Sequence, residues 1–258
     1  MEPVYAAVNA VVLSAHRAMG WRRTVVGAEH VPTTGGAVIA TNHIGYLDFT
    51  FIGYGARERG RLVRFFAKKE IFDKPGAGHL MRGMKHIPVD RYGRAQDSYA
   101  RGLAALARGE IIGMFPEGTI STSFVPGRGK TGAARMAMAA GVPLVPGAVW
   151  GSQRLLAKGR PRNLQRGVPI TISFGAPIPY DVEHTAGAVT DRLMSAIAEQ
   201  VQRAAATYPD APAGPEDAWW LPAHLGGTAP TVQQARAEAE SESRKRRARR
   251  RAQRALPP

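Results

Sequence analysis

Two residues near the start of the chain could together remove a proton from a hydroxyl group. His43 and Asp48 stand five positions apart in the segment Asn-His-Ile-Gly-Tyr-Leu-Asp, directly after the short apolar run 36–41. A neutral imidazole accepts a proton near neutral pH, and a carboxylate on its other ring nitrogen fixes the tautomer and stabilises the imidazolium that forms. On a regular helix the neighbours are three and four residues apart, so this pair meets only if a turn at Gly45 folds the chain back. Taken alone, the spacing favours a histidine that simply caps a turn.

Two further motifs follow at strand ends. Phe-Pro-Glu-Gly-Thr at 115–119 comes after the apolar run 111–114, and Val-Pro-Leu-Val-Pro occupies 142–146. With Asn-His-x4-Asp before them, these motifs resemble, in this order, the glycerolipid acyltransferase family, whose best-known members are the PlsC-like 1-acylglycerol-3-phosphate acyltransferases. The motifs span 41–146 and looser similarity covers about 25–179, which leaves the last third of the chain outside the resemblance.

The resemblance implies a reaction. A 1-acyl-sn-glycerol-3-phosphate O-acyltransferase moves a fatty acyl group from acyl-CoA or acyl-carrier protein to the free hydroxyl of 1-acylglycerol-3-phosphate, giving phosphatidate for phospholipid biosynthesis. His43 would be the base and Asp48 the residue that orients it, which agrees with the chemistry of the pair. Direct attack by the acceptor hydroxyl needs neither a protein nucleophile nor a cofactor, and the sequence contains no cysteine.

The resemblance also assigns residues to the acceptor. The Glu-Gly-Thr segment of the family binds the glycerol-phosphate part, so Glu117, Gly118 and Thr119 are expected to do so here, and Asn42 is counted with them. The backbone N–H groups of Gly118 and Thr119 could also contact a phosphate. The alternative for Glu117 is an ordinary carboxylate in a turn.

Several cations are candidates for holding the phosphate. The family's phosphate-binding arginine maps onto Arg91, whose alternative is a surface arginine paired with the acidic residue before it. Lys68 is a second candidate, because it follows a predicted strand on the same edge of the sheet. Many family members read Glu-Gly-Thr-Arg-Ser, but Ile120 stands at the position of that arginine. We expect Arg128 or Lys130 to supply the missing charge, or the acceptor to carry a different head group.

The elements that must position these residues alternate between strands and helices. Apolar runs at 37–41, 62–67, 111–115 and 144–149 read as buried strands, and helices are predicted between them. Such a pattern predicts an α/β fold with a central, mostly parallel sheet covered by helices. Ligand sites in these sheets gather at the carboxyl ends of the strands. Five of the candidate residues follow predicted strands, independently of any family: His43, Asp48, Lys68, Arg91 and Glu117.

Four regions are expected along the chain. Residues 1–23 form an apolar helix, either packed on the domain or lying on a bilayer, with the bilayer slightly favoured because an aromatic and two arginines end it. Residues 24–208 form the acyltransferase domain, with a first edge strand over 24–31 and a last helix over 189–206. Residues 209–228 are a linker and an aromatic segment docked on the core. Residues 229–258 are a basic tail, solvated or disordered.

Charge points to an anionic partner. The net charge is +15, of which the tail from Arg236 onward supplies +6 through nine Lys and Arg against three Glu. An anionic membrane, a phosphorylated substrate or a nucleic acid would fit. Nucleic acid is disfavoured because the basic run is terminal and lacks interleaved aromatics. With no stretch of about 18 apolar residues, we expect a peripheral protein on the cytoplasmic face of the cell membrane. The seven histidines show no metal-ligand spacing.

Overall fold

The computed structural model describes residues 2–90, 95–163 and 165–255, with only the backbone given for Ala95, Ser243, 245–247 and 249–255. One seven-stranded sheet has the order β1-β7-β6-β2-β5-β3-β4, and every neighbouring pair is parallel except β6 with β7. The strands are β1 Arg22–Val26, β2 Ala37–Thr41, β3 Val63–Lys68, β4 Ile87–Val89, β5 Ile111–Met114, β6 Leu144–Trp150 and β7 Pro169–Phe174. The predicted α/β fold with a mostly parallel sheet is confirmed.

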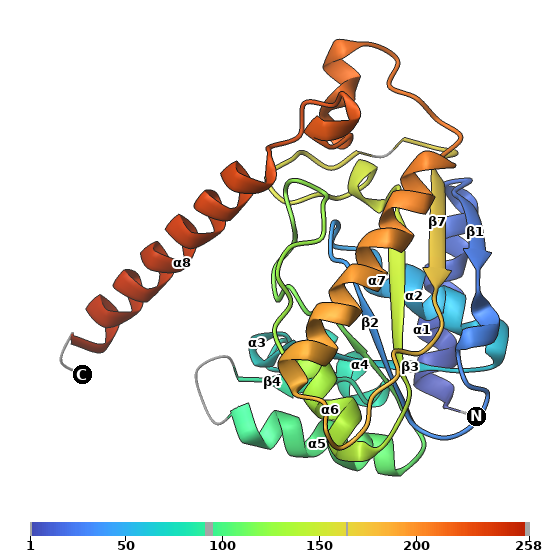
Figure 1. The fold of residues 1–258 in the computed structure, drawn as a ribbon, viewed down its shortest axis with the longest axis vertical. Coiled ribbons are helices and arrows are strands. Elements are labelled where there is room, and N and C mark those ends of the chain that lie inside the picture. The colour runs from blue at the N-terminus through green and yellow to red at the C-terminus, as the bar shows by residue number, and fades with distance from the viewer. Residues whose placement is uncertain (1, 91–94, 164, 256–258) are drawn as a thin grey trace.

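Helices cover both faces of this sheet (Figure 1). Alternate residues of β2 enter different cores: Val38 and Ala40 pack with residues of α5, α6 and α7, whereas Ala37 and Ile39 pack with residues of α2. Because both faces are covered, the central strands β2 and β6 are buried at every position. The helices are α1 Pro3–Ala18, α2 Asp48–Ala56, α3 Lys69–Phe72, α4 Ala77–Gly83, α5 Ala95–Ala107, α6 Gly132–Ala140, α7 Ala186–Ala206 and α8 Val232–Ala255.

Two predicted boundaries moved for local reasons. The edge strand expected over 24–31 is β1, which ends at Val26 because Gly27 adopts a left-handed φ of 71° and a 3-10 turn follows. The last helix of the domain begins at Ala186, three residues before the predicted start. Thr185 caps it there, since its side-chain oxygen accepts a hydrogen bond from the Ala188 N–H.

Helix α1 is docked on the domain. The Tyr5 hydroxyl donates to the Val63 carbonyl at 2.8 Å, and the buried His16 ring stacks on Phe51 with centroids 4.8 Å apart. Glu2, just before the helix, pairs with the buried Arg64. The opposite side of α1 faces outward, with Val11 71% exposed. None of the helices in the described ranges is long and apolar enough to span a bilayer.

The chain after α7 folds back onto the core, as expected for the aromatic segment. Arg154 is buried beside β6, pairs with Asp210 at 2.6 Å and lies over the Trp220 ring at 4.6 Å. Trp220 is 1% exposed. The buried Arg154 guanidinium therefore contacts this segment at two places, and Asp210 also pairs with Arg22 at 3.1 Å.

Helix α8 extends away from the rest of the molecule (Figure 1). The spacing of its charges predicts that Glu240 pairs with Arg244 and Glu242 with Arg246. In the structure Glu240 pairs with Arg236, Glu242 pairs with Lys158 of the body at 2.6 Å, and Glu238 lies 3.5 Å from the Thr122 hydroxyl. The side chain of Arg246 lies outside the described part of this helix. The acidic first half of α8 is thus attached to the body, while the cations are concentrated beyond it.

Candidate active site

The His43–Asp48 pair forms as the spacing predicted. The chain turns at Gly45, and Asp48 Oδ2 lies 2.9 Å from His43 Nδ1. The same oxygen accepts the N–H groups of Ile44 at 2.7 Å and Gly45 at 2.9 Å, while Oδ1 accepts the Ser152 hydroxyl at 2.6 Å. Asp48 is fully buried. A buried carboxylate needs such donors, because burying an unpaired charge is costly.

His43 is held by contacts on several sides. Its ring stacks on Phe115 with centroids 4.0 Å apart and planes 16° from parallel. Its side chain remains 19% exposed. With Nδ1 engaged by Asp48, Nε2 is the ring nitrogen left to take a proton from a hydroxyl. The arrangement fixes one tautomer and presents its basic nitrogen to a substrate.

Glu117 joins the two motifs. One of its oxygens accepts the His43 N–H at 3.1 Å and the other accepts the Gly127 N–H at 3.0 Å. Burial raises the pKa of Glu117 to about 7, and these two backbone hydrogen bonds offset only part of the effect. The carboxyl therefore changes charge near neutral pH, within hydrogen-bonding distance of the backbone of the base.

Exposed cations lie around the mouth of the site. Gly118 has a left-handed φ of 68°, and the Lys130 amine lies 2.8 Å from the point where a Cβ on Gly118 would stand. Gly118, Thr119, Arg128 and Lys130 are all exposed, as is Lys68 at the end of β3. The register of β2 with β5 and of β5 with β3 brings these strand ends to one edge of the sheet. Lys130 thus places a positive charge beside the Glu-Gly-Thr segment, where Ile120 replaces the arginine of many family members.

Three expectations need revision or fall outside the description. The Gly118 N–H donates to the Phe115 carbonyl at 3.0 Å, so it is already used within the turn. Asn42 is fully buried and exchanges two hydrogen bonds with the Val149 peptide, at 2.9 and 3.0 Å. These bonds hold the loop with His43 and Asp48 against β6, whereas a contact of Asn42 with the substrate was expected.

Arg91 lies outside the described residues. Ile120 is buried, so its side chain packs inward.

Sequence reasoning missed Ser152 and Phe115 as members of the site. Ser152 follows β6 just as His43 follows β2, so the rule that sites gather at strand ends could have found it. Phe115 was noted only as part of a motif, because its ring direction depends on the packing of β5 against β2. The part of the chain that the structure describes contains no cluster of three or more metal-ligating side chains.

Comparisons with known proteins identify related sequences. The family model described as Acyltransferase matches residues 22–150. A 1-acyl-sn-glycerol-3-phosphate acyltransferase of Bacillus subtilis (strain 168) is 32% identical over 178 residues, which are 68% of this chain and 86% of that protein. A chloroplastic 1-acyl-sn-glycerol-3-phosphate acyltransferase of Arabidopsis thaliana is 31% identical over 150 residues, 57% of this chain, and the match spans only 41% of that longer protein.

A solved structure supports the fold. The crystal structure of the 1-acyl-sn-glycerophosphate acyltransferase PlsC from Thermotoga maritima superimposes with a TM-score of 0.64 and 21% identity, covering 80% of this chain and 81% of that one. Together with the Bacillus relative and the family model, whose match includes the His43–Asp48 loop and the Glu117 turn, this leads to one conclusion: the chain belongs to the acyltransferase family.

Proposed function

We propose that this protein transfers a fatty acyl group from a thioester, acyl-CoA or acyl-carrier protein, to the free hydroxyl of 1-acylglycerol-3-phosphate, giving phosphatidate. The observation that carries the proposal is the 2.9 Å contact between His43 Nδ1 and the carboxylate of Asp48, which is fully buried and held by further donors on both oxygens. The names of the Bacillus and Arabidopsis relatives state this acyl acceptor for those proteins, which supports it here.

The reaction follows from the pair. The acceptor hydroxyl gives its proton to His43 Nε2 while its oxygen attacks the thioester carbonyl carbon, and Asp48 stabilises the imidazolium. The tetrahedral intermediate then collapses: the C–S bond breaks, the thiol sulfur takes the proton from His43, and the new ester remains on the acceptor. The negative phosphate of the acceptor is attracted by the exposed amines of Lys130 and Lys68 and by Arg128.

A different acceptor is the second candidate function, and Ile120 favours it. A buried isoleucine fills the position where many relatives have an arginine, so part of the expected phosphate grip comes from elsewhere. Another lysophospholipid or a glycolipid would need the same base and a different arrangement of cations.

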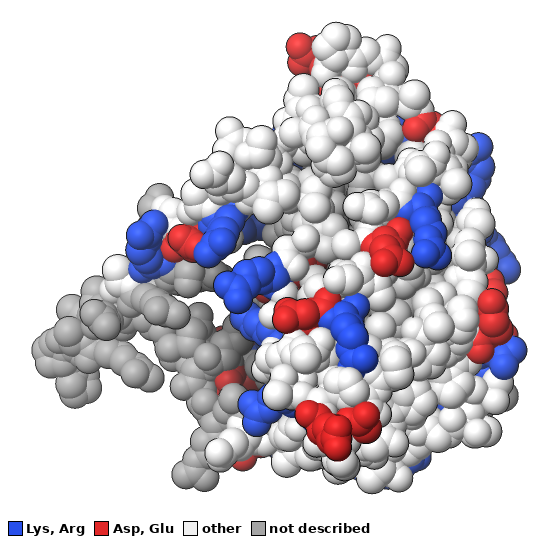
Figure 2. Space-filling view, in the orientation of Figure 1, with Lys and Arg blue, Asp and Glu red and all other residues white. Residues whose placement is uncertain are grey.

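We also propose that the protein works at the cytoplasmic face of the cell membrane, as a peripheral protein. Support comes from the outward side of α1, where Val11 is exposed, and from the basic end of α8. On the face shown in Figure 2, the described Lys and Arg side chains are interleaved with acidic ones. A single large basic surface for nucleic acid is therefore absent from the described part of that face.

The test is an acyl-transfer assay with purified protein and a series of acceptors. We expect 1-acylglycerol-3-phosphate to be the best acceptor, and His43→Ala to lower turnover by roughly two to four orders of magnitude in a folded protein. Asp48→Asn should also be severely impaired, because tautomer control is lost. His79→Ala, an exposed histidine on α4, is the matched control. Near-normal turnover in folded His43→Ala protein would contradict the mechanism, and a preference for another acceptor would establish the second candidate.

The nucleic-acid alternative has its own test. Truncation after Thr228 removes α8 and leaves the described catalytic contacts of His43, Asp48 and Glu117 in place. We expect acyl transfer to persist in this variant. Nucleic-acid binding that is lost with α8, in a chain without acyltransferase activity, would support the alternative.

A further inference from the structure

Three consecutive polar residues are buried just after β6. Ser152, Gln153 and Arg154 are each at most 3% exposed, and they form a 3-10 turn that follows Gly151. Buried polar side chains usually have partners, and a satisfied buried network fixes the arrangement of the segments that it joins. The match to the family model ends at residue 150, so this turn lies directly beyond it. The partners of the turn show which parts of the molecule it holds together.

One side of the turn supports the loop of the catalytic pair. The Ser152 hydroxyl donates to Asp48 Oδ1 at 2.6 Å, and the Tyr46 N–H donates to the Leu156 carbonyl at 2.9 Å. The loop also passes so close to the turn that a Cβ on Gly45 would stand 3.0 Å from the Ser152 carbonyl oxygen. The position of the Asp48 carboxylate therefore depends on where this turn lies.

The other side of the turn is held by residues 209–228, which we call the returning segment. The Gln153 side-chain nitrogen donates to the Trp220 carbonyl at 3.3 Å, and the Gln153 side-chain oxygen accepts the Gly151 N–H at 2.8 Å. Gln153 thus joins the backbone of the turn to the backbone of the returning segment. Arg154 contacts the same segment through its ion pair and through the Trp220 ring.

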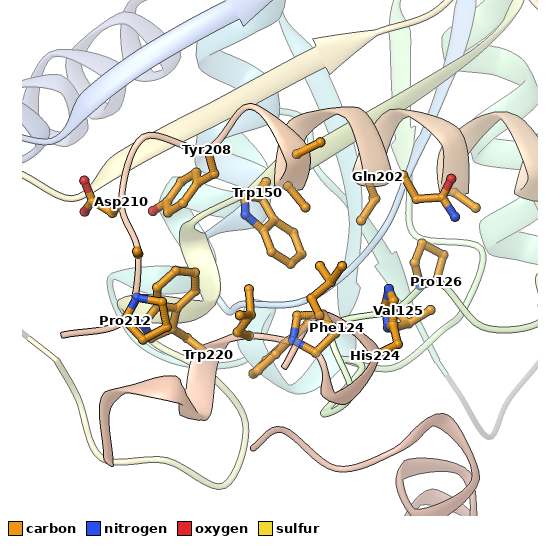
Figure 3. Close-up of a pocket in the computed structure, with 18 residues that line it drawn as sticks. Phe124, Val125, Pro126, Trp150, Gln202, Tyr208, Asp210, Pro212, Trp220 and His224 are labelled. Carbon is orange, nitrogen blue, oxygen red and sulfur yellow. The ribbon is translucent and has the colours of Figure 1, made fainter. Parts of the chain in front are cut away.

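The returning segment is packed less closely against α7. A cavity of about 330 Å³ lies between them, with walls from the 121–127 loop, the end of β6, α7 and the returning segment. Figure 3 shows Asp210 and Trp220 at one end of this cavity, and Gln202 and His224 at the other. Side chains that border an empty space lose attractive contacts on that side. The attachment of the returning segment therefore depends more on its polar contacts with the turn.

We propose that the returning segment positions the catalytic carboxylate, and that Gln153 is the residue that connects the two. The segment holds Gln153, Gln153 holds the turn, and Ser152 in that turn holds Asp48 beside His43. Gln153 is thus a positioning residue that acts through Ser152 and Asp48. Its effect on rate rests on the proposed acyl transfer, whereas its effect on the loop does not. Full activity would then need a part of the chain outside the match to the family model.

The first experiment removes the connection at Gln153. Gln153→Met keeps much of the length of the side chain and removes both of its hydrogen bonds. Because even a distant change that misplaces a catalytic group by about 1 Å can cost about a hundredfold in rate, we expect kcat to fall roughly tenfold with little change in KM. Gln202→Met, at an exposed glutamine of α7, is the matched control and should leave kcat unchanged.

A second variant at this position covers the case in which Gln153→Met does not fold. In Gln153→Glu the carboxylate still accepts the Gly151 N–H but cannot donate to the Trp220 carbonyl. We expect the same fall in kcat, and normal kcat in a folded Gln153→Glu protein would overturn the inference.

The second experiment asks whether the returning segment acts through Gln153. Trp220→Leu removes the ring that contacts Arg154 and loosens the segment, so it should lower kcat in the same way. Adding Gln153→Met should then cost little more, because both changes break one connection. Trp219→Leu changes the neighbouring tryptophan, which contacts the exposed Arg160, and should leave kcat unchanged. Fully additive losses from Gln153→Met and Trp220→Leu would overturn the connection.

The third experiment follows the loop itself and does not depend on turnover. The buried N–H groups of Ile44 and Gly45 donate to Asp48, so their hydrogen exchange reports how firmly the carboxylate is held. In Gln153→Met both amides should exchange at least about tenfold faster than in the parent protein. The amide of Ile39, in the middle of β2, should exchange at the parent rate, because the sheet stays intact.

The outcomes separate this inference from the proposed function. Unchanged exchange at Ile44 and Gly45 with unchanged kcat in Gln153→Met, in a protein that transfers acyl groups, would overturn the inference and leave the function standing. Faster exchange at these two amides, in a protein that transfers no acyl group, would keep the positioning role and reject the function. Equally faster exchange at Ile39 would show a general loss of stability and would also overturn the inference.

Discussion

At the scale of single residues, the site depends on how one carboxylate is held. Asp48 has three donors from its own loop and one from outside it, the hydroxyl of the buried Ser152. A hydrogen bond to a charged group contributes about 1.5–3 kcal/mol. Ser152 thus acts on the reaction through Asp48 and His43, as a positioning residue.

Replacing Ser152 by Ala should lower kcat roughly ten- to a hundredfold with little change in KM, because the carboxylate is left less firmly placed. The decisive measurement is a double-mutant cycle with Asp48→Asn. If Ser152 acts through Asp48, the second substitution costs little once the first is present. Ser173→Ala removes another buried hydroxyl, one without a partner among the described residues, and should leave kcat unchanged. Fully additive losses would show that Ser152 is merely structural.

Glu117 makes stability depend on pH. Its folded pKa is raised to about 7 by burial, from an ordinary value of 4.5. Between these values the unfolded chain has lost the proton that the folded protein still holds, so the stability that this group contributes is complete below pH 4.5 and is lost as pH rises to about 7.

The substitution Glu117→Gln removes that dependence. Between acid and neutral pH, the free energy of unfolding of the variant should rise by on the order of 2 kcal/mol relative to that of the parent protein. Urea unfolding at several pH values across this range measures the difference. Glu199→Gln, at an exposed glutamate on α7, should show no such trend. If the stabilities of the parent and of the Glu117→Gln variant ran parallel with pH, Glu117 would have the same pKa in the folded and unfolded protein.

At the scale of elements, the strands were the most predictable part. Predominantly apolar runs indicated buried parallel strands, and parallel strands bring the residues after them to one edge. His43, Glu117 and Lys68 therefore lie at one edge of the sheet, where the His43 N–H donates to Glu117. Side-chain direction was not predictable: Asn42 stands beside the base in the sequence, yet its amide faces β6. That direction depends on how the loop crosses the neighbouring strand, which a single sequence does not specify.

The C-terminal half of the structure was predicted only in outline. The aromatic segment was expected to dock on the core, but its attachment through Arg154 is a contact between residues 154, 210 and 220 that has no local signature. The cavity has the same origin, because its walls come from a loop, a strand end, α7 and the returning chain. Features made by distant segments emerge only when the segments are placed.

The attachment of this segment can be tested at Arg154. Arg154→Met keeps much of the side chain's bulk and removes its charge, which leaves Asp210 without this partner. Breaking a buried ion pair costs about 3–5 kcal/mol, and somewhat less is expected here because Asp210 is partly exposed. Proteolysis within 209–228 should become faster while the catalytic contacts persist. Arg160→Met, at an exposed arginine over Trp219, is the control; equal effects of both variants would contradict a special role for Arg154.

At the scale of the whole molecule, the structure changes how membrane attachment must be tested. Deleting α1 would remove Tyr5 and His16 from the core and leave Arg64 without Glu2, so lost binding could simply reflect damage to the domain. Val11 offers a cleaner site because it is 71% exposed on the outward side of α1. In the tail, ending the chain at Glu242 removes eight of its nine cations and keeps the contacts of Glu238 and Glu242 with the body.

The two proposed anchors should then behave differently in vesicle co-sedimentation. Val11→Asp should reduce binding to neutral and anionic vesicles alike, because it opposes insertion of an apolar helix side; Val182→Asp, at a fully exposed valine in a loop, is the matched control. The chain ending at Glu242 should lose binding only to anionic vesicles and only at low salt, since each cation near the surface contributes about 1 kcal/mol and salt screens it. If the combined variant still sedimented with neutral vesicles at high salt, neither α1 nor the tail would be the anchor, and another exposed apolar surface, such as Tyr46 and Phe49 beside the active site, would have to bind the membrane.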